Sequence, residues 1–207
     1  MKIITIILTA FLTVPVFAQA QYEQGMKKAF TLYGEGKLDE AANMFERIGN
    51  AEQDKWLPYY YVAQININKS WTVKDENVLK AQLDKAQEFI NMATTNSKDN
   101  AEIMVLQAHL YTAYVAFDGQ RYGMQYAAKV SEIYSKAKQL APDNPRVVFS
   151  KAEWDMGSAK YFGQDVTPYC KDIERALELF GTFKNEDPFY PDWGADRAQE
   201  ALKACKA

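Results

Sequence analysis

Residues 36–45 read Gly-Lys-Leu-Asp-Glu-Ala-Ala-Asn-Met-Phe, and this stretch decides the fold. Gly36 ends one helix, because glycine readily adopts the left-handed conformation found after a helix C-terminus. The acidic pair Asp39-Glu40 begins the next helix, where negative charge complements the helix dipole. Ala41 and Phe45 are four residues apart and therefore share one helix face. A small and a large residue on one face predict a helix that packs closely against a neighbouring helix.

The rest of the chain continues this alternation of helices and turns. Apolar residues recur at i, i+3, i+4 and i+7, and no run of alternating β-branched residues indicates a strand. Turn-forming residues interrupt the helical pattern at 34–36, 97–100, 142–145 and 187–188. Helix pairs of similar size indicate an internal repeat. We therefore predict an all-α fold.

The stretch 36–45 resembles the second half of a tetratricopeptide repeat (TPR), a helix pair with small residues in both helices, an Ala-x3-Phe element and a closing proline. Ala29 and Ala63 are 34 residues apart, which is one full repeat of this family. Counting onward in the same frame predicts small residues at positions 108 and 152, and alanine occupies both. The resemblance covers about residues 22–188 and implies an α-solenoid of TPR-like helix pairs.

The second helices of the later repeats fit the same frame. In the second repeat, the small, large and small positions hold Ala86, Ile90 and Ala93. In the third, the large, small and proline positions hold Tyr134, Ala137 and Pro142, and the fourth closes with Ala176-x3-Phe180 and Pro188. The chain departs from the family pattern at its first position, often tryptophan, which holds Gly25, Tyr59, Met104 and Val148. Repeats two to four also carry about 10–12 residues more than a standard repeat between their two helices.

Two interpretations of these insertions stay open. Because the insertions occupy the same place in successive repeats, they should stack along one edge, where Phe117, Tyr122, Tyr161 and Phe162 could form a binding rim. The interpretation that we favour is that each insertion lengthens two helices and that these rings pack between them, since burial of apolar area needs no ligand. If all four of these aromatic rings are buried in the protein core, the interpretation as a binding rim is excluded.

The last predicted helix, Trp193–Lys206, has no following partner, so we expect it to cap the open end of the solenoid. We expect it to be an antiparallel neighbour of helix Tyr169–Lys184, with the chain turning around Pro188. Cys170 precedes this proline by 18 residues and Cys205 follows it by 17, so a hairpin brings the two cysteines level. We predict a disulfide between them, with two free buried thiols as the alternative.

The N-terminus has the pattern of a secretory signal peptide. Lys2 precedes an uncharged, mostly apolar run over residues 3–16, and Ala18-Gln19-Ala20 supplies small residues before a cleavage point. We predict cleavage of residues 1–20, with the cut after Ala18 or Ala20, and one TPR-like domain over residues 21–207 of an exported, periplasmic or secreted protein. An uncleaved anchor is the alternative, but it requires about 18 or more apolar residues. No membrane span is expected after cleavage.

Composition and motifs argue against several functions. A net charge of −3 does not favour a nucleic-acid binder, which needs a basic surface. One histidine and two cysteines exclude a four-ligand Cys/His zinc site, and we predict neither a metal nor a cofactor. The chain has no glycine-rich phosphate loop, no G-x-S-x-G and no H-E-x-x-H. We predict no catalytic residues and no enzymatic activity, because no mutually consistent catalytic set is present.

The TPR resemblance implies that the first helix of each pair lines a concave face that holds a partner. The partner-binding residues implied in this way are Phe30, Tyr33, Tyr60, Gln64, Asn68, His109, Thr112, Phe149 and Glu153. Met26, Leu57, Glu102, Val105, Arg146 and Met156 belong to the same face. It lacks the Lys/Asn/Arg set with which some family members bind a C-terminal carboxylate, because Met26 and Phe30 stand at the corresponding places.

Aromatic residues make up 14% of the chain and occur in clusters, which serve either inter-helix packing or binding. We predict an exported, non-catalytic TPR-like module that binds a protein or peptide partner. The alternative is a glycan- or nutrient-binding accessory protein of the cell envelope, in which exposed aromatic side chains stack on the ligand. Fold resemblance does not choose between these functions.

Overall fold

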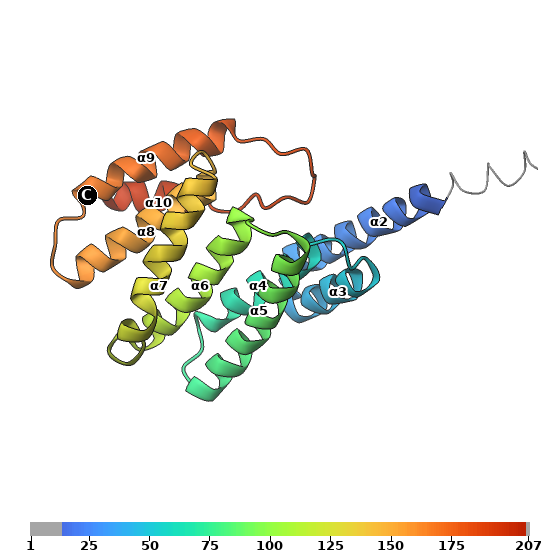
Figure 1. Ribbon diagram of the computed structural model, residues 1–207, viewed down its shortest axis with the longest axis horizontal. Coiled ribbons are helices and arrows are strands. Elements are labelled where there is room, and N and C mark those ends of the chain that lie inside the picture. Colours follow the sequence, from blue (N-terminus) through green and yellow to red (C-terminus); the bar gives the residue numbers. More distant parts are fainter. Residues whose placement is uncertain (1–13, 206–207) are drawn as a thin grey trace, which may run out of the picture.

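The computed structural model describes residues 14–205, and every regular element in this range is an α-helix (Figure 1). The helices are α2 (Val14–Gly34), α3 (Leu38–Ala51), α4 (Leu57–Ser70), α5 (Glu76–Asn96), α6 (Ala101–Phe117), α7 (Gly119–Leu140), α8 (Pro145–Tyr161), α9 (Thr167–Thr182) and α10 (Ala195–Cys205). The predicted all-α fold is confirmed. Residues 1–13, which include most of the predicted signal peptide, lie outside the described residues, and the predicted cut after Ala20 falls within α2.

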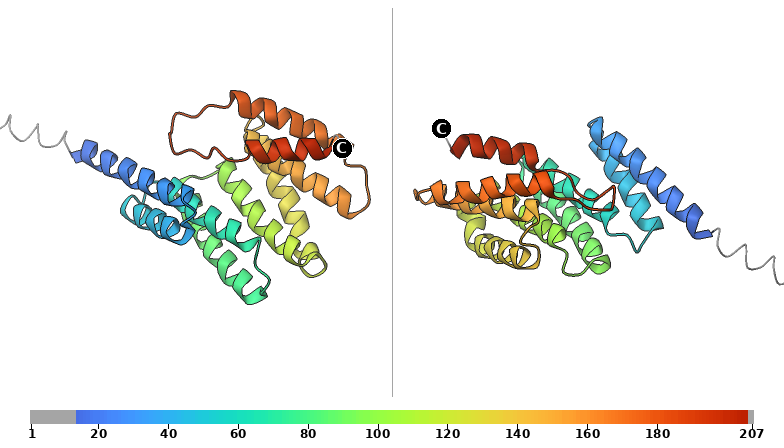
Figure 2. Two further views of the ribbon diagram at one scale, coloured as in Figure 1. Left: turned by 180° about the vertical axis from the view of Figure 1, so that it is seen from behind. Right: turned by 90° about the horizontal axis from the view of Figure 1, so that it is seen from above.

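Consecutive helices pack as antiparallel pairs, and the pairs stack into a curved array (Figures 1 and 2). The pairs are α2/α3, α4/α5, α6/α7 and α8/α9. Contacts between α4 and α6 and between α6 and α8 place the first helices side by side. We call the surface that these first helices form the inner face. In the described part of the chain, no helix is both long and apolar enough to cross a membrane.

The repeat frame predicted from the sequence is confirmed by burial. The small positions of the first helices are Ala29, Ala63, Ala108 and Ala152, and each is at most 1% exposed. The large positions Phe45, Ile90 and Tyr134 are at most 2% exposed, and the fourth, Phe180, is half-buried. Alanine allows two helix backbones to approach closely, and the large side chain fills the space beside it.

Side-chain caps explain where the later helices begin. Asn100 accepts hydrogen bonds from the backbone N–H of Glu102 (2.9 Å) and of Ile103, and Asn144 accepts one from Arg146 (2.9 Å). Asp75 caps α5 in the same way, 2.8 Å from the N–H of Asn77. Such caps satisfy N–H groups that have no partner within the helix. Two of these caps lie in the turns predicted at residues 97–100 and 142–145.

Most of the inserted residues lengthen helices, as we favoured. Helices α5 and α7 have 21 and 22 residues, whereas α3 has 14. Tyr122 is buried and Phe117 is half-buried, so both pack between helices. Tyr161 and Phe162, at the end of α8, are instead 70% and 68% exposed. Since not all four rings face the core, the binding rim is not excluded.

The connection between α9 and α10 is longer than a turn around Pro188. Residues 183–194 form no helix and run as an extended loop from the end of α9 to the start of α10 (Figure 1). We call residues 183–194 the strap. The predicted start of the last helix at Trp193 is therefore wrong by two residues, because Gly194 has a φ of +111° that an α-helix does not accommodate. Helix α10 packs on α9 through buried Ala198, as expected of a cap.

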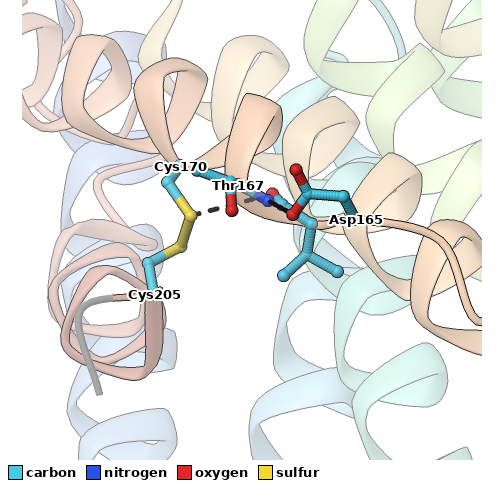
Figure 3. The surroundings of a disulfide bond; sticks show 5 residues. Asp165, Thr167, Cys170 and Cys205 are labelled. Carbon is cyan, nitrogen blue, oxygen red and sulfur yellow. Dashed lines mark hydrogen bonds between the residues drawn. A yellow bond between two sulfur atoms is a disulfide. The ribbon is translucent and has the colours of Figure 1, made fainter.

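Cys170 at the start of α9 and Cys205 at the end of α10 are joined by a disulfide (Figure 3). Their Cα atoms are 5.9 Å apart. Asp165 lies just before α9 and accepts a hydrogen bond from the N–H of Thr167 at 2.9 Å. Hydrogen bonds from the side chain and from the backbone of Thr167 hold the pKa of the Asp165 carboxyl below its usual value. The disulfide closes a loop that contains the whole strap.

One close contact between helix pairs requires a glycine. A Cβ atom at Gly49 in α3 would lie 2.6 Å from Cε1 of Tyr59, whose hydroxyl donates a 2.6 Å hydrogen bond to the Gly49 carbonyl. We expect Gly49→Ala to lower the free energy of unfolding by about 1–3 kcal/mol, because the buried Tyr59 ring must move. Thermal unfolding followed by circular dichroism measures the change.

A matched control lies in α8. A Cβ atom at Gly157 would meet no atom within 4 Å, so Gly157→Ala should raise stability by up to about 1 kcal/mol through helix propensity. A melting temperature that falls equally in both variants would show that the Tyr59 contact is not the cause.

Candidate functional site

The predicted partner-binding residues lie on the inner face, but most of them are not open to solvent. Tyr60 and Phe149 are 0% exposed and Gln64 is 6% exposed. Phe30, Tyr33, His109, Thr112 and Glu153 are half-buried, and Asn68 is exposed. What lies on this face is the strap of the same chain.

Phe189 of the strap packs against the first two helix pairs. Its ring stacks on Phe30 and meets Tyr22 edge-on, in each case with 5.9 Å between centroids. Its backbone carbonyl accepts a 2.6 Å hydrogen bond from the Tyr61 hydroxyl. Phe189 is therefore buried although it belongs to a loop.

Trp193 packs against the middle of the inner face. Its Nε1–H donates a 2.9 Å hydrogen bond to the Tyr60 hydroxyl, and its ring lies 5.5 Å from that of His109. Burial raises the pKa of Tyr60 well above its ordinary value. Burial, together with the charge of Arg197, lowers the pKa of His109 to about 4, so the imidazole is neutral at pH 7. The only histidine of the chain is thus neutral and lies against Trp193.

A buried ion pair lies beneath the strap. Arg146 of α8 is 2% exposed, and its Nε lies 2.8 Å and 2.9 Å from the two carboxylate oxygens of Glu102 in α6. Asn144 also donates to this carboxylate at 2.6 Å. The strap rings of Phe183 and Tyr190 lie 5.1 Å and 5.4 Å from the guanidinium carbon. The pair therefore joins α6, α8 and the strap.

The cap contacts the inner face through Glu153 of α8. Arg197 of α10 donates to its carboxylate at 2.8 Å. Burial raises the pKa of Glu153, and the charge and hydrogen bond of Arg197 oppose this shift. Four of the predicted partner-binding residues thus contact the strap or α10, namely Phe30, Tyr60, His109 and Glu153.

A second candidate site lies at the edge where the two helices of a pair are joined. A pocket of about 360 Å³ opens between the α4–α5 turn and the end of α6. Its lining consists of Ser70, Trp71, Val73, Lys74, Ala113, Ala116 and Phe117. Trp71 is 43% exposed. We call this pocket the edge pocket.

Exposed apolar side chains and a hydrogen-bonded charged cluster both lie along the edge that holds the edge pocket. Among the described residues, the exposed large hydrophobic side chains lie mostly along this edge, at Trp71, Val78, Met124, Tyr161 and Phe162. Glu76 at the start of α5 is bonded to Lys80, Tyr122 and Arg121, and these hydrogen bonds lower its pKa to about 2. They tie the start of α5 to the start of α7 beside the pocket.

A larger groove of about 570 Å³ lies between α2 and α3. Its lining is mainly polar and charged and contains no aromatic ring: Lys28, Leu32, Glu40, Asn43, Met44, Glu46, Arg47 and Asn50. No group of three or more His, Cys, Asp or Glu side chains in residues 14–205 is arranged to hold a metal ion.

Two solved structures resemble this one over most of their length. The HusA haemophore from Porphyromonas gingivalis has a TM-score of 0.76 and 22% sequence identity, covering 89% of this chain and 92% of that chain. A thermophilic TPR protein from Thermus thermophilus has a TM-score of 0.57 and 11% identity, covering 89% of this chain and 98% of that chain. The fold is a TPR-like α-solenoid. No protein-family model and no curated protein sequence matches the chain.

At these identities the likeness shows the fold alone. Both TPR-like neighbours are described as binding or repeat proteins and not as enzymes. The solenoid of TPR-like helix pairs with a C-terminal capping helix, predicted from the sequence, is confirmed.

Sequence reasoning missed the strap and its aromatic side chains. Phe189, Tyr190 and Trp193 stand close together between Pro188 and Gly194, where a helix cannot form. Several aromatic residues in a segment without helical pattern were the available signal, because a solvent-exposed loop rarely carries them. The sequence placed Glu102 and Arg146 on the inner face but held no sign that they pair with each other.

Proposed function

We propose that this protein is an exported, non-catalytic binding module whose ligand is haem or a related porphyrin, held at the edge pocket. The observation that carries the proposal is the edge pocket itself, in which Trp71 and Phe117 line an opening that also contains Lys74. The likeness to a haemophore over about nine-tenths of both chains supports the ligand class. The apolar run and Ala-x-Ala of residues 1–20 support export.

The chemistry of the pocket suits a flat, apolar ligand that carries carboxylates. A porphyrin has a broad aromatic macrocycle and, at one side, propionate groups. The indole of Trp71 and the ring of Phe117 offer apolar surface for the macrocycle. The ammonium of Lys74 offers a charge for a propionate.

The lining of the edge pocket contains no histidine, cysteine or methionine. His109 is half-buried against Trp193 on the inner face. Binding at the edge pocket therefore depends on contacts with the macrocycle and not on coordination of the iron. Metal-free protoporphyrin should consequently bind with an affinity similar to that of haemin.

The test is a titration of the purified protein with haemin and with metal-free protoporphyrin, followed by the porphyrin absorbance band and by tryptophan fluorescence. Trp71→Ala should weaken both affinities by about thirtyfold, since an aromatic anchor at the centre of a site contributes about 2 kcal/mol. Lys74→Gln should weaken binding of the free acid by about threefold, because an exposed ion pair contributes less than about 1 kcal/mol. It should leave binding of the dimethyl ester unchanged.

Trp154→Ala provides the matched control. Trp154 lies on α8, where its Nε1–H donates a 2.9 Å hydrogen bond to Ser131, and it is not part of the edge pocket. This variant should bind porphyrin like the wild type. Absence of any porphyrin band shift at micromolar concentrations, or equal affinities of Trp71→Ala and wild type, would refute the proposal.

A further inference from the structure

The connection between α8 and α9 exposes two adjacent aromatic side chains to solvent. Tyr161 and Phe162 are 70% and 68% exposed, and their rings meet edge-on with 5.1 Å between centroids. Single exposed apolar side chains are ordinary in soluble proteins, whereas adjacent ones form a patch of the kind that marks an interaction site. We call these two rings the knob.

Backbone hydrogen bonds hold the knob in one position. The N–H of Gln164 donates to the Ala159 carbonyl at 2.8 Å. The N–H of Gly163 donates to the Lys160 carbonyl at 3.2 Å, and Gly163 has a φ of +66°. These two bonds and the left-handed glycine form a Schellman motif at the end of α8. Because the knob is fixed before it binds, little conformational entropy is lost when it inserts into a pocket.

We propose that the knob of one copy of this protein inserts into the edge pocket of a second copy, so that two copies form a dimer through this edge. The edge pocket has a volume of about 360 Å³ and apolar walls from Trp71, Val73 and Phe117, which suit an aromatic ring. Its lining includes no residue of the α8–α9 connection of its own chain. A second copy can supply the ring. This inference does not depend on porphyrin binding.

The positions of the knob and the edge pocket fit a two-fold dimer. The α4–α5, α6–α7 and α8–α9 connections follow one another along the same edge of the array (Figures 1 and 2). The pocket lies at the first of these connections and the knob at the third. When two such edges meet in antiparallel orientation, each knob faces the pocket of the other copy. Such an interface is closed, because both copies use the same surface.

The charges along this edge are complementary between antiparallel copies. Lys74 lines the edge pocket, and the exposed Asp165 follows Phe162 by three residues. In the antiparallel arrangement, Lys74 of each copy lies on the same side as Asp165 of the other, so opposite charges approach twice. The net charge of −3 gives only weak repulsion between copies.

The opposite edge of the array has a different character. The exposed residues of its connections are mostly charged and include Asp54, Lys98, Asp99 and Asp143. Leu140 at the end of α7 is an exposed large hydrophobic side chain on that edge, with 46% of its surface accessible. It therefore provides a control position that has the chemistry of the knob without its place.

The first experiment measures dimerisation of the purified protein without porphyrin, by sedimentation velocity at concentrations up to about 0.5 mM, since a small interface forms a transient dimer. Tyr161→Ala with Phe162→Ala should weaken dimerisation at least tenfold, because buried aromatic anchors dominate interface energies. Both rings are exposed in the monomer, so the melting temperature of this variant should match that of the wild type. Leu140→Ala should dimerise like the wild type. A wild type that stays monomeric, or a knob variant that dimerises equally well, would overturn the inference.

The second experiment tests whether the knob and the pocket meet each other. Ala116 is exposed and lines the edge pocket, so Ala116→Trp should fill the pocket and weaken dimerisation as the knob variant does. A mixture of the two variants retains one intact knob and one intact pocket. It should associate at least tenfold more tightly than either variant alone, as measured by energy transfer between labelled chains. A mixture that associates no better than its components would refute the insertion.

The knob variant also separates this inference from the proposed function. Its edge pocket is intact, so its porphyrin titration reports on porphyrin binding alone, and dimerisation of the ligand-free wild type reports on the dimer alone. If a porphyrin occupies the edge pocket, it excludes the knob of the second copy. Porphyrin should then dissociate the dimer, a consequence that rests on the proposed function.

Discussion

Glu102→Ala is expected to lower the free energy of unfolding by about 3–5 kcal/mol, because it leaves a buried guanidinium without its counter-charge. Arg146 is 2% exposed and Glu102 is 0% exposed, so water cannot replace the lost carboxylate without rearrangement of the fold. The same carboxylate also accepts from Asn144, which caps α8. Urea denaturation of the purified variant, followed by circular dichroism, measures the change.

The double variant Glu102→Leu with Arg146→Met separates loss of charge pairing from loss of packing. It removes both charges and keeps apolar volume, so it should be only about 1–2 kcal/mol less stable than the wild type. If the double variant and Glu102→Ala lose the same stability, the unpaired Arg146 charge is not the cause of the loss.

Removal of the disulfide should have the next largest effect. In the chain-entropy model, the link between Cys170 and Cys205, which are 35 residues apart, stabilises the fold by about 4 kcal/mol. Cys170→Ser with Cys205→Ser should therefore lower the melting temperature by about 8–16 °C in a chain of this size. The physical reason in this model is that the link removes conformational freedom from the unfolded chain, so its loss favours unfolding.

Chemical labelling tests whether the link forms in solution. The wild type should show no alkylatable thiol by mass spectrometry without reductant and two after reduction. The serine double variant should melt at the same temperature with and without reductant, whereas the wild type should melt lower with reductant. Two alkylatable thiols in the unreduced wild type would rule out the disulfide.

The sequence alone was sufficient for the helices, their pairing and the repeat frame. Ala29, Ala63, Ala108 and Ala152 could be placed in one frame because helix packing depends on residues a few positions apart and on a repeat that recurs along the chain. That Cys170 and Cys205 lie opposite each other on two antiparallel helices followed from counting residues on either side of Pro188. Such relations are local or periodic, and they can be read without knowledge of the tertiary structure.

Only the tertiary structure decided what the inner face touches. The hydrogen bond between Tyr61 and Phe189 joins residues 128 positions apart, and that between Tyr60 and Trp193 joins residues 133 apart. The strap has neither a helical period nor a repeat, so its position depends on the summed burial of three aromatic side chains against helices that must first be assembled. The pairing of Glu102 with Arg146 and the edge pocket likewise arise where separate repeats meet. For this reason the sequence indicated a binding protein, but the structure was needed to show that one of its two candidate surfaces is covered by its own chain.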